Sequence, residues 1–430
     1  MKVLKSSSLS PFGGLNFVIN EAMTLDINTL LINNLPALPL QCKYNWFDIL
    51  MSYWSVFFCG GDCAEDLSIN IRNGLRNNPY INIPSPDRVL ERIKSLSDSA
   101  QIFTANRGSK EHQFSLAENL NRLNLKMLSL LPGFNRKDVV VDYDNTIIFT
   151  EKADARTTYK MENGYFPGVG MVGRHIVYVE NRNGNSSAHV LQHETIDRMS
   201  KLMQEFGITI DAIRADSASY TYEIIQSMNR AAKRIFIRVR MNETLERAIA
   251  NIKEWKEIKI GDHVVFRGSI TFTPFARASR DHKIKDGPLK EYRLVVSKEA
   301  RRDGQINLFT GEAFSYSSIM TNDFEMTDDQ VVNFYNARGS QEREFDELKN
   351  DFGWNKMPFS KLEQNTVFLL IMAMCKNLYT HMIVKFSERI KSLSPHFRIK
   401  KFIFRFICIP ARWSVSGRTK QLRLYGSHFP

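Results

Sequence analysis

The middle of the chain predicts an α/β fold, because β-rich runs alternate there with helical patterns. The first run, residues 139–148, is rich in β-branched side chains and is typical of a buried strand. A Gly-containing turn signal, Asn183-Gly184-Asn185, closes a second β segment and predicts a hairpin. The expected elements are, in order, strand 139–148, hairpin segment 169–180, helix 190–206, strand 208–214, a helix from Tyr220 and strand 235–241.

The flanking regions differ from this centre. Residues 1–131 read as short helices, with Ser85-Pro86 as an N-cap followed by proline at the first helical position. Helices joined by glycine turns on a basic chain suit a DNA-reading domain, although such helices are common in other proteins. Residues 257–321 are β-rich and are interpreted as an inserted β subdomain. A helical pattern returns from Thr327 to Leu393, broken once at Pro358.

Composition narrows the class of protein. The chain has 430 residues, 43% hydrophobic and 24% charged, which excludes a disordered, collagen-like or disulfide-scaffold protein. Lysine and arginine exceed acids by 58 to 46, a net charge of +12, so the surface should attract polyanions such as nucleic acid. Five scattered cysteines favour reduced, buried thiols and a cytoplasmic location, and Cys59 and Cys63 alone make a poor zinc motif. No apolar run reaches bilayer length and no signal peptide is evident, so no membrane partner is expected.

One motif is rejected. Gly168-Val169-Gly170-Met171-Val172-Gly173 fits the dinucleotide-binding fingerprint by spacing. That fingerprint requires a strand before it and a helix after it, whereas β-rich sequence follows here. Glycines within a strand pair are the better interpretation.

The acids are more informative. Asp142 and Asp144 are spaced as alternate residues of a strand, so both side chains should leave one face. Asp216 follows the next strand, at the edge where open α/β sheets place their sites. Metal-dependent phosphodiester chemistry requires such hard oxygen ligands. With 46 acids in the chain, most are nevertheless surface groups or caps.

A helical segment supplies further candidates. At about 100° per residue, Tyr335, Arg338, Glu342 and Lys349 fall within roughly 60° of arc, beside the apolar face. A carboxylate there could reach a sheet edge, and the stripe, about 21 Å long, could follow a nucleic-acid backbone. The alternative is a row of i,i+4 ion pairs such as Arg338 with Glu342.

The C-terminal region is strongly basic. Residues 385–430 contain eleven Lys or Arg and one acid, Glu388, with aromatic residues interleaved. This mixture suits binding to phosphates and bases, although a basic stripe beside a β core has a similar composition.

The spacing Tyr335-x2-Arg338-x3-Glu342-x6-Lys349 resembles the Tyr-Arg-Glu-Lys signature of bacterial insertion-sequence transposases of the DDE type. Three further segments resemble that family: DYDNT its first-Asp motif, RADSAS its second, and GYFPG with ENRNGNSS the hairpin between them. The resemblance is clear over residues 132–358. Ser217-Ala218-Ser219 departs from the residues that usually follow the second Asp.

The resemblance implies an α/β fold with a ribonuclease H-like catalytic core interrupted by a β-rich insertion. It divides the chain into a helical N-terminal DNA-binding domain (1–131), the first part of the core (132–243), the insertion (244–326), the second part of the core with the catalytic helix (327–393) and a basic C-terminal tail (394–430).

The same resemblance implies that Asp144, Asp216 and Glu342 are catalytic and hold two Mg²⁺ ions, with Mn²⁺ as a possible substitute. Tyr335, Arg338 and Lys349 would bind DNA phosphates at the transposon end. Asp142 competes for the first position, but Asp144 is favoured because Asn145-Thr146 follow it as in the family. The rival third ligand is Asp346, one helical turn after Glu342.

The implied function is a DNA transposase that cuts transposon ends and joins them to target DNA. Its partners would be double-stranded DNA, at inverted-repeat ends and target, and a second copy in a homodimer on DNA, in the cytoplasm at the nucleoid. Two alternatives stay open: a catalytically inactive repressor or architectural protein, and a ribonuclease H-like nuclease without strand transfer.

Overall fold

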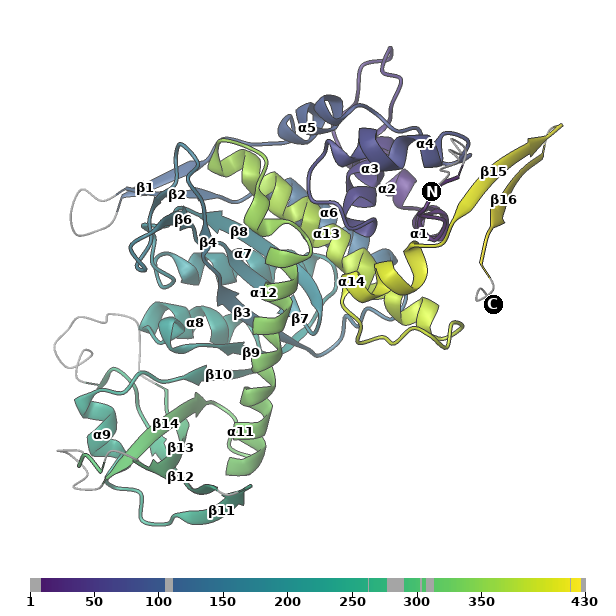
Figure 1. Ribbon diagram of the computed structural model, residues 1–430. Coiled ribbons are helices and arrows are strands. Elements are labelled where there is room, and N and C mark those ends of the chain that lie inside the picture. The colour runs from purple at the N-terminus through teal and green to yellow at the C-terminus, as the bar shows by residue number, and fades with distance from the viewer. Residues whose placement is uncertain are drawn as a thin grey trace.

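A large mixed sheet forms the centre of the molecule, so the expected α/β fold is confirmed (Figure 1). The computed structural model describes residues 9–104, 111–261, 263–276, 290–301, 304–306, 313–417 and 419–426. Across the sheet the strands are β1 (Gln101–Thr104), β2 (Glu111–Ser115), β8 (His175–Arg182), β7 (Gly168–Val172), β3 (Val139–Asn145), β9 (Ile210–Ala215), β10 (Arg234–Arg238), β14 (Phe314–Thr321), β13 (Tyr292–Ala300), β12 (His263–Phe272) and β11 (Lys256–Ile260). A small separate sheet contains β4 (Ile148–Phe149), β6 (Asn163–Tyr165) and β5 (Arg156–Thr157).

The three central strands β3, β9 and β10 are parallel, and the other pairs in the sheet are antiparallel. Tyr143 of β3 is aligned with Ala215 of β9, and Ala215 with Ile237 of β10. Val141, Tyr143, Ile213 and Ala215 are fully buried. The carboxyl ends of these strands therefore meet at one edge of the sheet.

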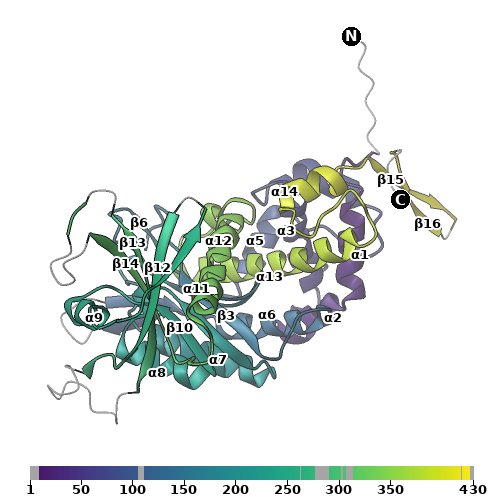
Figure 2. The same ribbon diagram turned by 90° about the horizontal axis from the view of Figure 1, so that it is seen from below.

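Helices cover both faces of the sheet (Figure 2). Helices α7 (Gln192–Glu205) and α8 (Tyr222–Ala231) connect β8 to β9 and β9 to β10, and they lie together on one face. On the opposite face lie α11 (Asp328–Asn336) and α12 (Ser340–Asn350). Thr327 begins α11 with a capping box that includes Gln330.

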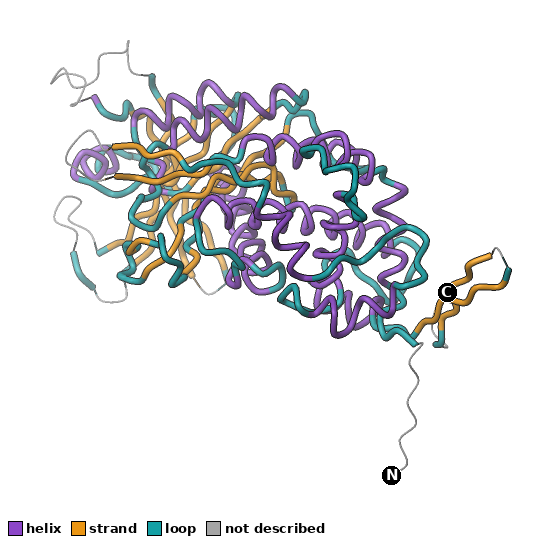
Figure 3. Tube along the Cα trace, turned by 90° about the horizontal axis from the view of Figure 1, so that it is seen from above, coloured by secondary structure: helices purple, strands orange, loops and turns teal. Residues whose placement is uncertain are grey.

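The remaining helices gather at one end of the molecule around α13 (Leu362–Ser387) (Figure 3). Helix α13 is long and apolar enough to cross a membrane, but 94% of its apolar segment is buried inside this fold. Burial in a core accounts for that composition. Ser85 caps α5 as expected, with proline at the first turn. The helices of this end are α1 (Leu15–Thr24), α2 (Ile27–Asn34), α3 (Trp46–Phe58), α4 (Arg72–Leu75), α5 (Pro86–Lys94), α6 (Glu118–Leu130) and α14 (Ile399–Phe402).

The structure corrects three sequence-based expectations about strands. Residues 1–131 are not helical throughout, because β1 and β2 lie within them and β2 pairs with β8 of the central sheet. The turn of the β7–β8 hairpin lies at Gly173, whose φ of +57° suits glycine, and not at Asn183-Gly184-Asn185. The 244–326 insertion does not form a separate sheet: β14 pairs with β10, so backbone hydrogen bonds extend the central sheet into it. Helix α9 (Glu243–Ile249) leads into the insertion.

The basic C-terminal tail is also more structured than its composition suggests. Phe402 and Phe406 are buried and pack against Phe386 of α13, with ring centroids 6.2 and 5.0 Å away. These two rings are core residues and cannot stack on bases. The tail ends in a β-hairpin, β15 (Ala411–Ser416) and β16 (Thr419–Leu424); Arg418 and residues 427–430 lie outside the described residues.

Candidate active site

Asp144 and Asp216 lie at the ends of two adjacent parallel strands. Each directly follows a member of the aligned pair Tyr143 and Ala215, and neighbouring strands are about 4.8 Å apart. The Asp216 side chain accepts a hydrogen bond from the Ala218 backbone N–H (3.1 Å) and caps a short turn at 217–219. The unusual Ser-Ala-Ser sequence therefore still forms a turn that holds this carboxylate at the strand end.

The environment of Asp144 opposes its ionisation. The pKa of Asp144 is raised to about 6, mainly by burial and in part by the negative charge of Asp216, while Arg338 opposes the shift. The Arg338 guanidinium lies 2.7 Å from Asp144 Oδ2. Two acids repel one another at this sheet edge, and one cation contacts Asp144. Such a site favours additional positive charge.

Asp142, the rival of Asp144, is engaged elsewhere. Both of its carboxylate oxygens accept hydrogen bonds from Arg214 on β9, each at 2.6 Å, and both side chains are buried. A bidentate pair of this kind leaves little capacity for a metal ion. The geometry supports Asp144 as the candidate at the first position.

The segment from α11 to α12 crosses the carboxyl edge of the sheet. Tyr335 is 6% exposed and its hydroxyl donates a hydrogen bond to the carbonyl of Ala215 (3.3 Å). Arg338 contacts Asp144, and the Gln341 side-chain amide donates to the backbone carbonyl of Asp142 (3.4 Å). Three side chains of one segment therefore contact the ends of β3 and β9.

A 3₁₀ turn at Ala337–Gly339 separates α11 from α12, so the predicted single continuous helix is wrong there. A 3₁₀ turn has about three residues per turn in place of 3.6, which rotates the following residues relative to Tyr335. The four residues therefore do not form one uniform stripe.

Glu342 follows Gln341 directly and is exposed. Within the described part of the chain its carboxylate has no hydrogen-bond or ion-pair partner. The oxygens of Asp144, Asp216 and Glu342 do not all lie within 4.8 Å of one another. Among the described residues that distance is met by the exposed Asp62 and Cys63 with the half-buried Asp66. The exposure of Cys63 also departs from the expectation of buried thiols.

Arg338 has unused hydrogen-bonding capacity. Its side chain is 15% exposed, and its Nε and Nη2 atoms are buried without a hydrogen-bond acceptor in the described residues. The contact with Asp144 is therefore close but poorly aligned for hydrogen bonding. An oxyanion beside the acids would satisfy these donors.

Lys349 and Asp346 lie outside this group. Burial lowers the pKa of Lys349, and the neighbouring Lys160 lowers it further. Lys349 lines a hollow with residues of the α3 end and with Lys400. Asp346 is ion-paired with Arg398 (2.5 Å) and is exposed, so nothing links it to the strand-end acids.

The sequence analysis did not identify Arg214 and Gln341 as important residues. Arg214 of β9 binds the Asp142 side chain of β3, and Gln341 of α12 binds the backbone of the same residue. Arg214 stands two residues before Asp216, but its partner, Asp142, is 72 residues away in the chain. Only the strand register brings the two together. No local signal marks this pair.

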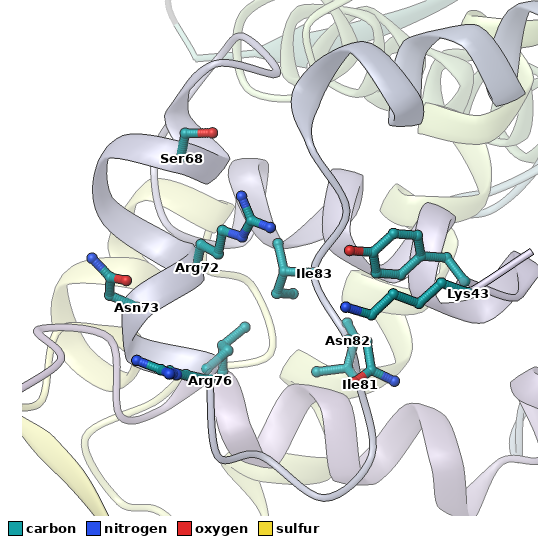
Figure 4. A pocket seen from close by; sticks show the side chains of 10 residues that line it. Lys43, Ser68, Arg72, Asn73, Arg76, Ile81, Asn82 and Ile83 are labelled. Carbon is teal, nitrogen blue, oxygen red and sulfur yellow. The ribbon is translucent and has the colours of Figure 1, made fainter.

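A separate basic hollow of about 520 Å³ lies among the N-terminal helices (Figure 4). Lys43, Arg72 and Arg76 line it together with the apolar side chains of Ile81 and Ile83, and no acid is among its lining residues. The three cations are exposed and have no ion-pair partner among the described residues. Such a surface is suited to binding phosphates.

Comparison with known proteins now identifies the chain. No curated protein matches it. A solved structure that it resembles is a piggyBac transposase in a synaptic complex with hairpin DNA, with a TM-score of 0.43 and 12% identity over 91% of this chain and 77% of that one. The family model "Transposase DDE domain group 1" matches residues 24–430. DDE transposases generally depend on divalent metal ions. The chain therefore belongs to the DDE transposase domain family and is a DDE transposase, an enzyme of DNA transposition.

Proposed function

We propose that this transposase cuts the ends of its transposon and joins them to target DNA by two-metal phosphoryl transfer. The observation that carries this proposal is the position of Asp144 and Asp216 at adjacent strand ends, with Arg338 from a helix beside them. Acids from separated parts of the chain meet at one edge of the sheet, where phosphodiester chemistry requires hard oxygen ligands.

The residues present fit a divalent metal centre. Burial and the charge of Asp216 raise the pKa of Asp144, so the two carboxylates favour a cation between them, and Glu342 has no ion-pair or hydrogen-bond partner among the described residues. Asp144, Asp216 and Glu342 would hold two Mg²⁺ ions, with Mn²⁺ as a substitute. When bound, these ions supply an activated water or 3′-hydroxyl nucleophile and stabilise the leaving oxygen.

The protein's own residues would position DNA. Two buried donors of Arg338, Nε and Nη2, have no well-aligned acceptor among the described residues, and a phosphate oxygen next to the acids would accept from them. Tyr335 holds the α11 end against β9 and would reach a phosphate only by giving up its bond to Ala215. Lys349, farther along α12, would bind the backbone away from the cleavage point.

We assign the ribonuclease H-like core to β8, β7, β3, β9 and β10, in that spatial order, with α7 and α8. Support comes from the antiparallel strands β8, β7 and β3 followed by the parallel strands β9 and β10. The N-terminal helices would bind DNA through their basic hollow of Lys43, Arg72 and Arg76. We further propose a homodimer on DNA, because two transposon ends must be paired, and a cytoplasmic, nucleoid-associated location.

A cleavage and strand-transfer assay on a duplex that carries the inverted repeat flanking the gene tests the proposal. Asp144→Asn, Asp216→Asn and Glu342→Gln should each lower cleavage by more than about 100-fold while duplex binding persists, because loss of a ligand should exceed the cost of losing a supporting residue. Asp346→Asn is the matched control and should cleave normally. Mg²⁺ should raise the Tm of the wild type and not that of Asp144→Asn.

The other outcomes separate the alternatives. Cut ends without joined products would indicate a nuclease that does not transfer strands. Tight end binding without cleavage under any divalent ion would indicate a repressor or architectural protein. Normal cleavage by one of the three variants would remove that residue from the site.

A further inference from the structure

The β15–β16 hairpin projects from the helical end of the molecule, away from the central sheet (Figures 1 and 2). A two-stranded hairpin of six-residue strands is not stable by itself in water, so its orientation depends on what holds its base. Its outer residues contribute little to the core, because Arg412, Val415 and Lys420 are all exposed.

The base of the hairpin is fixed to the N-terminal segment. Ser10 and Ala411 exchange two backbone hydrogen bonds of 2.8 Å each, and Trp413 Nε1 donates to the buried Asn16 side chain (2.9 Å). Gly13 approaches this region so closely that a Cβ atom would lie 2.6 Å from Ala411 Cβ and from the carbonyl oxygen of Ile409. The hairpin is therefore a directed projection and not a loose end.

The two faces of the hairpin differ. Strand alternation places Trp413 and Leu422, cross-strand partners, on the face of the anchoring contact to Asn16. The other face is formed by three polar pairs: Arg412 with Arg423, Ser414 with Gln421, and Ser416 with Thr419. Every side chain of this second face can donate a hydrogen bond, and two of them are cationic.

The pair Arg412 and Arg423 is unfavourable in the isolated protein. Like charges directly opposite one another in a hairpin destabilise it, since their Cβ atoms are about 5 Å apart. Neither guanidinium has an ion-pair or hydrogen-bond partner within the described residues, and the sequence contains no acid after Glu388. A polyanion would remove this repulsion by binding to both.

We propose that the polar face of β15–β16 binds the backbone of double-stranded DNA, with the ribbon lying in the major groove. This proposal rests on the proposed transposase function. A two-stranded ribbon fits a groove about 12 Å wide, and six residues extend roughly 20 Å along it. Arg412 and Arg423 contact phosphates, and Ser414 and Gln421, the next pair of this face along the ribbon, lie over the base edges.

Binding of the full chain to a labelled 40-base-pair duplex of mixed sequence, measured by fluorescence anisotropy across a salt series, tests this assignment. Arg412→Gln and Arg423→Gln should each weaken binding by roughly tenfold at 0.1 M salt. Each should also make the slope of log K against log salt less negative by about 1. Lys420→Gln, a matched loss of one charge on the opposite face, should leave both quantities unchanged. All three positions are exposed, and loss of Arg412 or Arg423 removes a contact between like charges, so the Tm should not fall.

Unchanged binding and slope in Arg412→Gln and Arg423→Gln would overturn the proposal, as would an equal effect of Lys420→Gln. A change in sedimentation without a change in DNA binding would assign this face to a second copy of the chain and would also overturn it. DNA cleavage is measured in a separate assay. If wild type and variants never cut DNA but differ in binding as expected, the hairpin assignment stands and the proposed function fails.

Discussion

Two clusters of acids border α12, and they differ in how their charges are compensated. Glu344 and Glu347 are buried and face cations: Glu344 pairs with Lys376 of α13 and with Arg174 (3.3 Å), and Glu347 pairs with Arg174 (3.5 Å). Asp144 and Asp216, at the strand ends, repel one another, and the one ion pair that they form within the described part of the chain is that of Asp144 with Arg338. In the first cluster two buried acids face two cations, although the Glu347 oxygens accept no hydrogen bond from the described residues, whereas the second cluster sets two acids against one cation.

Acids that are only two positions apart in the chain fall on opposite sides of this difference. On β3, Asp142 is bound on both oxygens by Arg214, while Asp144 is not. On α12, Glu344 is enclosed by cations, while Glu342 is exposed and unpaired within the described residues. Residue type and sequence position therefore do not show which of these acids is compensated. What differs is how completely the carboxylate oxygens are bound by cations.

The largest effect is expected in the first cluster. Lys376→Met removes the cation that faces Glu344 in the core, so the free energy of unfolding should fall by about 3–5 kcal/mol. Urea denaturation measures it. The double variant Lys376→Met with Glu344→Leu should recover most of this loss, because no buried charge is left unpaired. If the single variant is as stable as the wild type, the cluster does not support the fold in this way.

The next prediction concerns the stability of variants at Asp142 and Asp144. The two substitutions should change the free energy of unfolding at pH 7 in opposite directions. The folded protein holds a proton on Asp144 more tightly than the unfolded chain, since burial raises its pKa from 3.8 to about 6. Its contribution to stability is therefore full below about pH 4 and is lost as the pH rises through 6. In metal-free buffer, Asp144→Asn should gain up to about 3 kcal/mol relative to wild type between pH 4 and pH 7.

Asp142→Asn is the control for this contrast. It leaves the Arg214 guanidinium buried without its carboxylate, so this variant should be destabilised at pH 7 by a few kcal/mol. Urea unfolding at pH 4, 5.5 and 7 measures both variants. A loss of stability in Asp144→Asn at pH 7 would mean that Asp144 is as well compensated as Asp142.

The same contrast explains which features the sequence could predict. The strands β3, β9 and β10 were predictable because buried parallel strands read as short β-branched runs, and Asp144 and Asp216 stand at their ends. The pairing of Asp142 with Arg214 was not predictable, since it depends on the register of strands 72 residues apart. The local sequence shows which acids stand at the strand ends. Which cations face each acid depends on the tertiary structure.

Two other errors have similar causes. The β insertion was expected as its own subdomain, yet β14 pairs with β10, and strand pairing partners cannot be read from hydrophobic pattern alone. The aromatic residues of the C-terminal tail looked available for bases, but Phe402 and Phe406 pack on Phe386. Composition cannot tell an aromatic residue in the core from one at the surface.

The smallest effect concerns Lys349, which lies in neither acid cluster. Burial and the neighbouring Lys160 both lower its pKa, so a phosphate near Lys349 would be favourable. Lys349→Gln should weaken binding of a transposon-end duplex by roughly fivefold at 0.15 M salt. It should also make the slope of log K against log salt less negative by about 1. Cleavage of bound DNA and the urea midpoint should not change, because Lys349 forms no ion pair within the described residues. If cleavage at saturating DNA falls instead while binding persists, Lys349 acts together with the strand-end acids. The group of residues around Asp144 and Asp216 would then be larger than described above.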